Sequence, residues 1–217
     1  MPRFVDLSQP LYDGMPSYPS DPPFRMKLFR TMKDHGVQVT QVELGTHQGT
    51  HLDAPAHFYA DGVTVEQIPL ERFYGPAVLV DLAPEGALPG TTPITPEMLL
   101  PHRKKFEAQA KVIIRTGWED MVGREGYFTE LPSLTLEAAQ WIAETKIGLL
   151  GLDLPTPSKI AGRPVHYALL AKGTEIVLLE GLVNLRSLPE RFILVAFPLR
   201  LRGGDGSPVR AVAIVED

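Results

Sequence analysis

Three histidines and one aspartate lie within eleven residues of each other near the start of the chain, in residues 46–58. These four residues are His47, His51, Asp53 and His57. Neutral imidazoles and carboxylates are the usual ligands of zinc and related divalent ions. An extended chain would separate positions 47 and 57 by roughly 33 Å, so the segment must bend, and Gly49 and Pro55 permit it. The pattern predicts a metal site on a bent loop that leaves a strand.

The chain contains no cysteine, so its ligands are histidines and carboxylates, which favours an open catalytic site over a closed structural one. A second candidate ligand is Glu180, which ends an apolar run that begins at Ile176. An unpaired buried carboxylate is costly, so Glu180 needs a cation, either a metal ion or an arginine. Glu175 lies closer to His166 in the sequence, but we expect its side chain to be exposed.

Strands and helices that could position these side chains follow from the hydrophobic pattern. Strands are predicted at 3–7, 24–30, 37–44, 77–82, 111–116, 147–152, 191–201 and 209–215, with a hairpin turn at 203–206 between the last two. Helices are predicted at 64–73, 95–108, 136–145 and 164–173, and an apolar stretch runs over 176–185. Prolines make residues 8–23 an arm or loop. The fold class is therefore α/β, with a mixed, barrel-like sheet and flanking helices.

Three further side chains have competing interpretations. His35 and His102 lie among charged neighbours and are expected to face solvent. Trp118 follows the strand predicted at 111–116, where it could either form the floor of a substrate pocket or pack in the core.

Composition limits the possible partners. The 217 residues are 44% hydrophobic and carry a net charge of -5 with a pI near 5.7, which suits a single domain over residues 1–217. An acidic chain gives no reason to expect binding to nucleic acid or to an anionic membrane. The N-terminal residues lack the apolar region of a signal peptide and no run is long enough to span a membrane, so we expect a soluble, cytoplasmic protein.

The motif His47-x-Gly49-Thr50-His51-x-Asp53-Ala54-Pro55-x-His57 resembles the signature of the cyclase family of metal-dependent hydrolases. The resemblance implies the swivelling β/β/α fold and a homodimer or homotetramer. It also implies two divalent metal ions per chain, zinc first and manganese as the alternative. The implied ligands are His47, His51 and Asp53 for one ion, and Asp53 (bridging), His166 and Glu180 for the other. By the same resemblance, His57 is a general acid/base and Tyr18 contacts the substrate.

The resemblance implies hydrolysis of an amide, namely N-formyl-L-kynurenine to L-kynurenine and formate, the arylformamidase step of tryptophan catabolism. Tyr18 stands where the arylformamidases of the family carry Trp, so two alternatives stay open. One is hydrolysis of a cyclic amide or lactone, as in the isatin hydrolases. The other is a metal-binding scaffold without turnover, in which His57 would have no necessary place.

Overall fold

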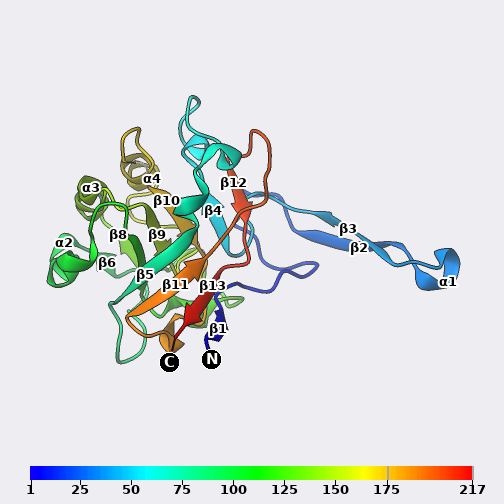
Figure 1. Ribbon diagram of the computed structural model, residues 1–217, viewed down its shortest axis with the longest axis horizontal. Coiled ribbons are helices and arrows are strands. Elements are labelled where there is room, and N and C mark those ends of the chain that lie inside the picture. Colours follow the sequence, from blue (N-terminus) through cyan, green and yellow to red (C-terminus); the bar gives the residue numbers. More distant parts are fainter. Residues whose placement is uncertain (175, 217) are drawn as a thin grey trace.

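The computed structural model describes residues 1–174 and 176–216, so the expectation for Glu175 lies outside the described residues. A curled nine-stranded sheet forms the centre of this described part (Figure 1). In sheet order its strands are β1 (Arg3–Asp6), β13 (Val212–Val215), β11 (Arg191–Val195), β5 (Tyr74–Asp81), β7 (Lys111–Arg115), β9 (Leu149–Leu152), β10 (Val177–Glu180), β4 (His51–Asp53) and β12 (Gly206–Pro208). The predicted mixed α/β fold is confirmed, because strands β5, β7, β9 and β10 run parallel while the outer pairs are antiparallel.

Both faces of the central strands are buried. Ile113 of β7 belongs to one hydrophobic cluster, whereas its neighbours Val112 and Ile114 belong to a second cluster on the opposite face. Helices α2 (Pro96–Leu99), α3 (Leu136–Thr145) and α4 (Arg163–Leu169) contribute apolar side chains to the second cluster. Burial on both faces explains why these strands read as continuous apolar runs in the sequence.

One predicted helix has the expected bounds, and two others are broken by proline. Helix α3 starts after Thr135, whose side chain accepts a hydrogen bond from Ala138 N as an N-cap. The helix predicted over 95–108 starts as expected after Thr95 but is α-helical only over α2, because α2 gives way to a 3-10 helix, Leu100–Lys105, that contains Pro101. The helix predicted over 64–73 is instead two 3-10 turns with Pro69 between them. Proline lacks the N–H that a continuous α-helix requires.

The C-terminal hairpin prediction was only partly right. Strands β11 and β13 pair antiparallel as expected, but they are not joined by a tight turn at 203–206. The connection crosses to the far edge of the sheet, where β12 pairs with β4. Gly206 therefore begins a strand, and β12 satisfies backbone groups of β4 that would otherwise lie at a sheet edge.

The metal motif also departs from the predicted loop. Its middle, His51–Asp53, is the fully buried strand β4, which is hydrogen-bonded to β10 on one side and β12 on the other. Because side chains alternate along a strand, Leu52 packs into the first hydrophobic cluster while His51 and Asp53 share the opposite face. A strand thus fixes the relative positions of two motif side chains.

A hairpin of β2 (Arg25–Arg30) and β3 (Val39–Glu43) projects away from the sheet, with the short helix α1 (Met32–His35) at its tip (Figure 1). All residues of both strands are exposed, and His35 faces solvent as expected. Residues 8–23 form no helix or strand, as the prolines predict. None of the helices in the described part of the chain has the length and hydropathy of a membrane-spanning segment.

Candidate metal centre

Two neighbouring strands bring three of the predicted ligands together. Glu180, the last residue of β10, lies directly opposite His51 of β4 in the strand register. His51 Nε2 is 3.5 Å from Glu180 Oε2 and 3.4 Å from Asp53 Oδ1. All three side chains are buried. Directly opposed residues in an antiparallel pair have side chains on the same face, so this contact follows from the register.

His47 reaches the same point from the loop before β4. Its Nδ1 lies 2.7 Å from Asp53 Oδ1. The loop is held against the end of β10, where Gly181 adopts a left-handed conformation with φ of +67°. A Cβ on Gly181 would lie only 2.6 Å from the carbonyl oxygen of Gly49, so a glycine is needed for this close approach.

His166 enters from the opposite side, on helix α4. Its Nε2 is 3.8 Å from Glu180 Oε1, and its ring stacks on Phe58 with centroids 4.4 Å apart. Phe58 follows the metal motif directly in the sequence. The motif therefore supplies both ligand candidates and the aromatic ring against which His166 is oriented.

The five predicted ligands form two overlapping trios. In each trio, one nitrogen or oxygen atom from every residue lies within 4.8 Å of the others. The first trio is His47, His51 and Asp53, and the second is Asp53, His166 and Glu180. The sharing of Asp53 between the trios is the arrangement expected of a carboxylate that bridges two ions.

The electrostatics of this cluster fit divalent cations. Glu180 Oε1 is buried and has no hydrogen-bond partner among the described residues. Burial, and then the charge of Asp53, raise the pKa of Glu180 well above its usual value. Burial lowers the pKa of His166 to about 4, so its imidazole is neutral and able to ligate at neutral pH.

The surroundings of His47 also favour positive charge. Burial opposes protonation of this imidazole, but the Asp53 and Asp205 carboxylates outweigh burial and raise the pKa of His47 to about 10. Burial would raise the pKa of Asp53, but the neighbouring His47 and His51 outweigh burial and hold this pKa well below its usual value. Unbalanced buried carboxylates are costly, and a bound cation would compensate them. The donor set therefore fits the divalent metal that the sequence predicts.

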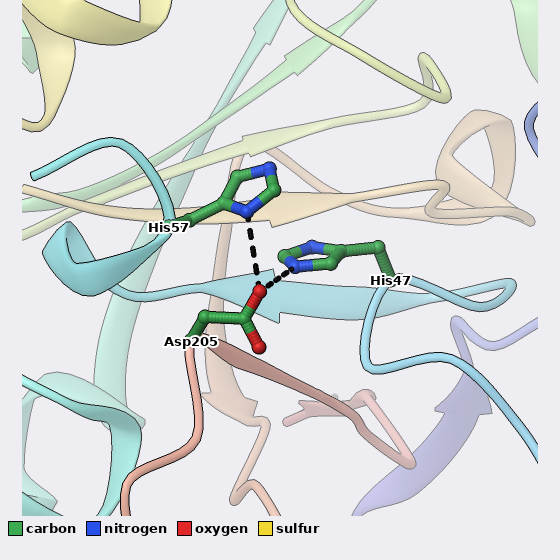
Figure 2. A group of neighbouring side chains, drawn as sticks. All are labelled: His47, His57 and Asp205. Carbon is green, nitrogen blue, oxygen red and sulfur yellow. Dashed lines mark hydrogen bonds and ion pairs between the residues drawn. The ribbon is translucent and has the colours of Figure 1, made fainter. Parts of the chain in front are cut away.

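His57 lies beside the first trio at the end of a 3-10 turn, Pro55–His57. Its ring is 3.8 Å from the ring of His47, centroid to centroid. Figure 2 shows Asp205 between the two histidines, with Oδ2 at 3.0 Å from His47 Nε2 and 3.3 Å from His57 Nδ1. Burial lowers the pKa of His57. A neutral, partly exposed imidazole at this position can accept or donate a proton.

A cavity of about 410 Å³ opens over the cluster, and both trios and His57 line it. Tyr18 from the proline-rich segment forms part of its wall, and the Tyr18 ring lies 5.9 Å from Phe128 in an edge-on contact. Lys159 Nζ donates a hydrogen bond to the Tyr18 hydroxyl at 3.0 Å. The lining of the cavity therefore includes aromatic side chains as well as the cluster of charged groups.

Trp118 does not form the floor of this cavity. Its side chain is buried in the second hydrophobic cluster, and its Nε1 donates to the carbonyl of Tyr127 at 3.0 Å. The pocket interpretation of Trp118 was wrong, and the core interpretation is confirmed. Tyr127 itself lines the cavity, so Trp118 supports the wall from behind. His102 lies on the 3-10 helix after α2 and does not line the cavity, but it is half-buried rather than fully exposed to solvent as predicted.

The residues of this site that sequence reasoning missed include Gln9, Tyr127, Phe128 and Asp205. Gln9 Nε2 donates to the Tyr127 hydroxyl at 3.0 Å and to the carbonyl of Gly181 at 2.9 Å. None of the four stands in a spaced motif. The sequence places Asp205 in the predicted turn, directly before Gly206. Nothing in the sequence indicates that this segment crosses to β4 and so reaches the site.

Comparison with known proteins finds relatives that match almost the whole chain. Residues 5–158 match the Cyclase family model ("Putative cyclase"). Kynurenine formamidase from Bacillus mycoides (strain KBAB4) is 30% identical over 214 residues, which cover 97% of this chain and 96% of that protein. Kynurenine formamidase from Salinibacter ruber is 32% identical over 221 residues, covering 96% and 95%.

A solved structure agrees with these sequence matches. Isatin hydrolase A from Labrenzia aggregata, bound to benzyl benzoate, superimposes with a TM-score of 0.85 at 29% identity, covering 100% of this chain and 94% of that one. Another neighbour of the same fold is described as a potential metal-dependent hydrolase with cyclase activity, with a TM-score of 0.82. This chain belongs to the cyclase family of metal-dependent hydrolases.

Proposed function

We propose that this protein is a metal-dependent amide hydrolase that converts N-formyl-L-kynurenine to L-kynurenine and formate. The observation that carries the proposal is the pair of donor trios that share Asp53 and line one cavity together with His57. The kynurenine formamidases of Bacillus mycoides and Salinibacter ruber, which match nearly the full chain, support the same substrate.

In this proposal two divalent metal ions, zinc in the first instance and manganese as the alternative, bind per chain. His47, His51 and Asp53 bind one ion, while Asp53, His166 and Glu180 bind the other. The two buried carboxylates that otherwise oppose each other support this assignment. Divalent ions bound there supply Lewis acidity, which lowers the pKa of a water molecule and polarises a carbonyl oxygen.

The chain's own residues supply the proton transfers. His57, on the wall of the cavity, accepts a proton at Nε2 from the attacking water and then delivers it to the departing amide nitrogen, since an amine is a poor leaving group until it is protonated. The carboxylates of Asp53 and Glu180, which line the cavity, attract the divalent cations.

The aromatic side of the cavity is suited to an aryl substrate. Tyr18 and Phe128 both line the cavity, and their rings contact each other edge-on. An aryl amide that stacks against Tyr18 would hold its carbonyl group toward the donor cluster. Aromatic pairs of this kind contribute about 0.5–1.5 kcal/mol beyond simple burial.

A second candidate substrate is a cyclic aryl amide. The structural similarity to isatin hydrolase A from Labrenzia aggregata favours it, together with the tyrosine at position 18. A cyclic amide contains the same carbonyl and nitrogen that the first proposal requires, so the same donor residues would act on it. The two candidates differ in the shape that the aromatic wall accepts.

A comparison of substrates tests both candidates. The purified, zinc-loaded protein is assayed with N-formyl-L-kynurenine and with isatin, next to a His57→Ala variant. We expect the highest kcat/KM on N-formyl-L-kynurenine, and we expect His57→Ala to keep its metal but lose at least 100-fold in kcat. Hydrolysis of isatin alone would select the cyclic amide. A zinc-loaded protein that hydrolyses neither compound would contradict the enzyme proposal, and the scaffold alternative would replace it.

We also propose that the protein is at least a homodimer, in which a second copy covers the β2–β3 hairpin. Met26, Leu28 and Val42 lie on one face of this hairpin and are exposed by 41%, 56% and 48%. An isolated two-stranded hairpin is only marginally stable in water. Charge favours a second copy as the partner, because residues 24–44 contain four basic and two acidic residues, whereas the rest of the chain contains 17 basic and 24 acidic residues.

The oligomer is tested by light scattering coupled to gel filtration. Wild-type protein should have the mass of a dimer or tetramer, and Leu28→Glu should shift it toward the monomer. Gln41→Glu is the matched control, because position 41 pairs with Lys27 on the other face of the hairpin. A monomeric wild-type protein would contradict this proposal.

A further inference from the structure

Asp205 is brought to the metal motif by the crossing segment that sequence reasoning missed. Its carbonyl oxygen accepts a hydrogen bond from Ala54 N at 2.9 Å, directly after β4. The next residue, Gly206, is packed so closely that a Cβ would lie 2.6 Å from the carbonyl oxygen of Leu52 and 2.7 Å from Cε1 of His47. The backbone of Asp205 is therefore fixed beside the motif rather than free at the surface.

The side chain of Asp205 is held in place as well. Thr46 Oγ1 donates a hydrogen bond to Oδ1 at 2.9 Å, which leaves Oδ2 to face the two imidazoles. Oδ2 is 3.0 Å from His47 Nε2 and 3.3 Å from His57 Nδ1 (Figure 2). The two rings are tilted by 31° relative to each other, so both edges can face one oxygen atom.

The chemistry of a carboxylate determines what these contacts do. An ionised carboxylate only accepts hydrogen bonds, so both facing ring nitrogens must carry protons. On His47, the other nitrogen, Nδ1, faces Asp53 Oδ1 at 2.7 Å, and it is the atom at which a bound cation would replace the proton and use the lone pair. His57 has its lone pair on Nε2, which points away from Asp205 (Figure 2). A single oxygen atom would thus select the tautomer of a ligand candidate and of the proposed general acid/base.

We propose that Asp205 is a positioning residue that sets the tautomer and ring orientation of both His57 and His47. The part that concerns His57 in turnover rests on the proposed hydrolase function, whereas the part that concerns His47 and metal affinity does not. Two rival interpretations exist. Asp205 could be a surface ion pair without effect on the site, or it could join His47 and His57 as a third trio that binds a metal ion.

Nitrogen-15 NMR of the imidazoles in the zinc-loaded protein separates these interpretations. The chain has only six histidines, so their ring nitrogens can be assigned with single-site variants. We expect His57 to carry its proton on Nδ1 in the wild type and to shift toward the Nε2-protonated tautomer in Asp205→Asn. His51 is an internal reference, because its Nδ1 faces the carbonyl of Gly49 at 3.0 Å and should not respond.

Asp120→Asn is the matched control, since Asp120 is an exposed aspartate in an ion pair with Arg186 at 2.9 Å, remote from the cavity. In Asp205→Asn we expect kcat to fall by about 100-fold or more with KM changed less than about threefold, and zinc affinity to weaken by about 10–100-fold. Thr46→Val, which removes only the anchor of Oδ1, should give an intermediate loss.

Three results would overturn the proposal. An unchanged His57 tautomer with kcat within about twofold of wild type would leave Asp205 as a surface ion pair. A His57 Nδ1 signal shifted by direct metal binding would assign Asp205 to a metal site instead. Zinc affinity equal to that of Asp120→Asn would remove the role toward His47. If the wild type lacks both formamidase and isatin hydrolase activity, the proposed function is refuted. The NMR and zinc-affinity measurements still test whether Asp205 positions the two histidines.

Discussion

Substitution of Glu180 by glutamine should separate the stability of the metal centre from the stability of the fold. Glu180 is buried, and its Oε1 has no hydrogen-bond partner among the described residues. Without metal, the carboxyl group gains little from its surroundings, because burial and Asp53 both disfavour its charged form. We therefore expect the metal-free Glu180→Gln protein to have a free energy of unfolding within about 1 kcal/mol of the wild type.

The metal-loaded proteins should differ much more. A ligand at about 1,000 times its dissociation constant stabilises the folded state by about 4 kcal/mol per site. For a chain of this length, each kcal/mol corresponds to about 2–4 °C in Tm. Loss of one of two metal sites in Glu180→Gln should thus remove about 8–16 °C of the zinc-induced increase in Tm. Metal analysis should find one ion fewer per chain than in the wild type.

Calorimetry of both proteins with excess chelator and with excess zinc measures the effect. Glu119→Gln is the control, since Glu119 is a carboxylate with little exposure whose oxygens accept from Leu185 N at 3.0 Å and Arg186 N at 3.3 Å. This variant should lower Tm with and without zinc by the same amount. Equal zinc-induced increases in Tm for the wild type and Glu180→Gln would refute the assignment of Glu180 as a ligand.

Three further predictions concern the fold and the cavity. Gly181→Ala should lower the free energy of unfolding of the metal-free protein by about 2–3 kcal/mol, because Gly181 has a φ of +67° and the new Cβ would meet Gly49. Urea denaturation measures this change, and a loss below about 0.5 kcal/mol would argue against the close contact. Burial raises the pKa of Asp153 to about 7, against hydrogen bonds from Thr116 and Gly117 that lower it. Because the folded form then holds this proton to higher pH than the unfolded form, the stability that Asp153 contributes should be full below about pH 4 and fall as pH rises to about 7. The difference in unfolding free energy between the metal-free wild type and Asp153→Asn should follow this course, with an amplitude on the order of a few kcal/mol, and a difference that is independent of pH would contradict it. Tyr18→Ala should raise KM for the aryl amide about 3–10-fold with a smaller change in kcat, and an unchanged KM would remove Tyr18 from the substrate wall.

Much of the candidate site was predictable because its residues are close in sequence. His47, His51, Asp53 and His57 form one compact motif, and their residue types already indicate a metal ion. Glu180 was found by a different argument, the cost of an unpaired charge at the end of an apolar strand. The structure agrees with that argument, since Glu180 lies opposite His51 in the sheet.

The parts that the sequence did not reveal depend on long-range pairing. The segment 201–208 reads as a turn locally, yet β12 pairs with a strand more than 150 residues earlier, and Asp205 reaches His57 only through that pairing. The aromatic wall at Tyr127 and Phe128 likewise comes from a connecting segment without a pattern of its own. Proline explains the helix errors, because Pro69 and Pro101 each interrupt a run whose hydrophobic spacing resembles a helix.

The most direct test of the account is a zinc titration of the metal-free protein, with hydrolysis of N-formyl-L-kynurenine measured at each step. We expect activity to rise with added zinc and to reach its plateau at about two equivalents per chain. Full activity in the metal-free protein, or zinc binding at two equivalents with no hydrolysis of either N-formyl-L-kynurenine or isatin, would contradict it.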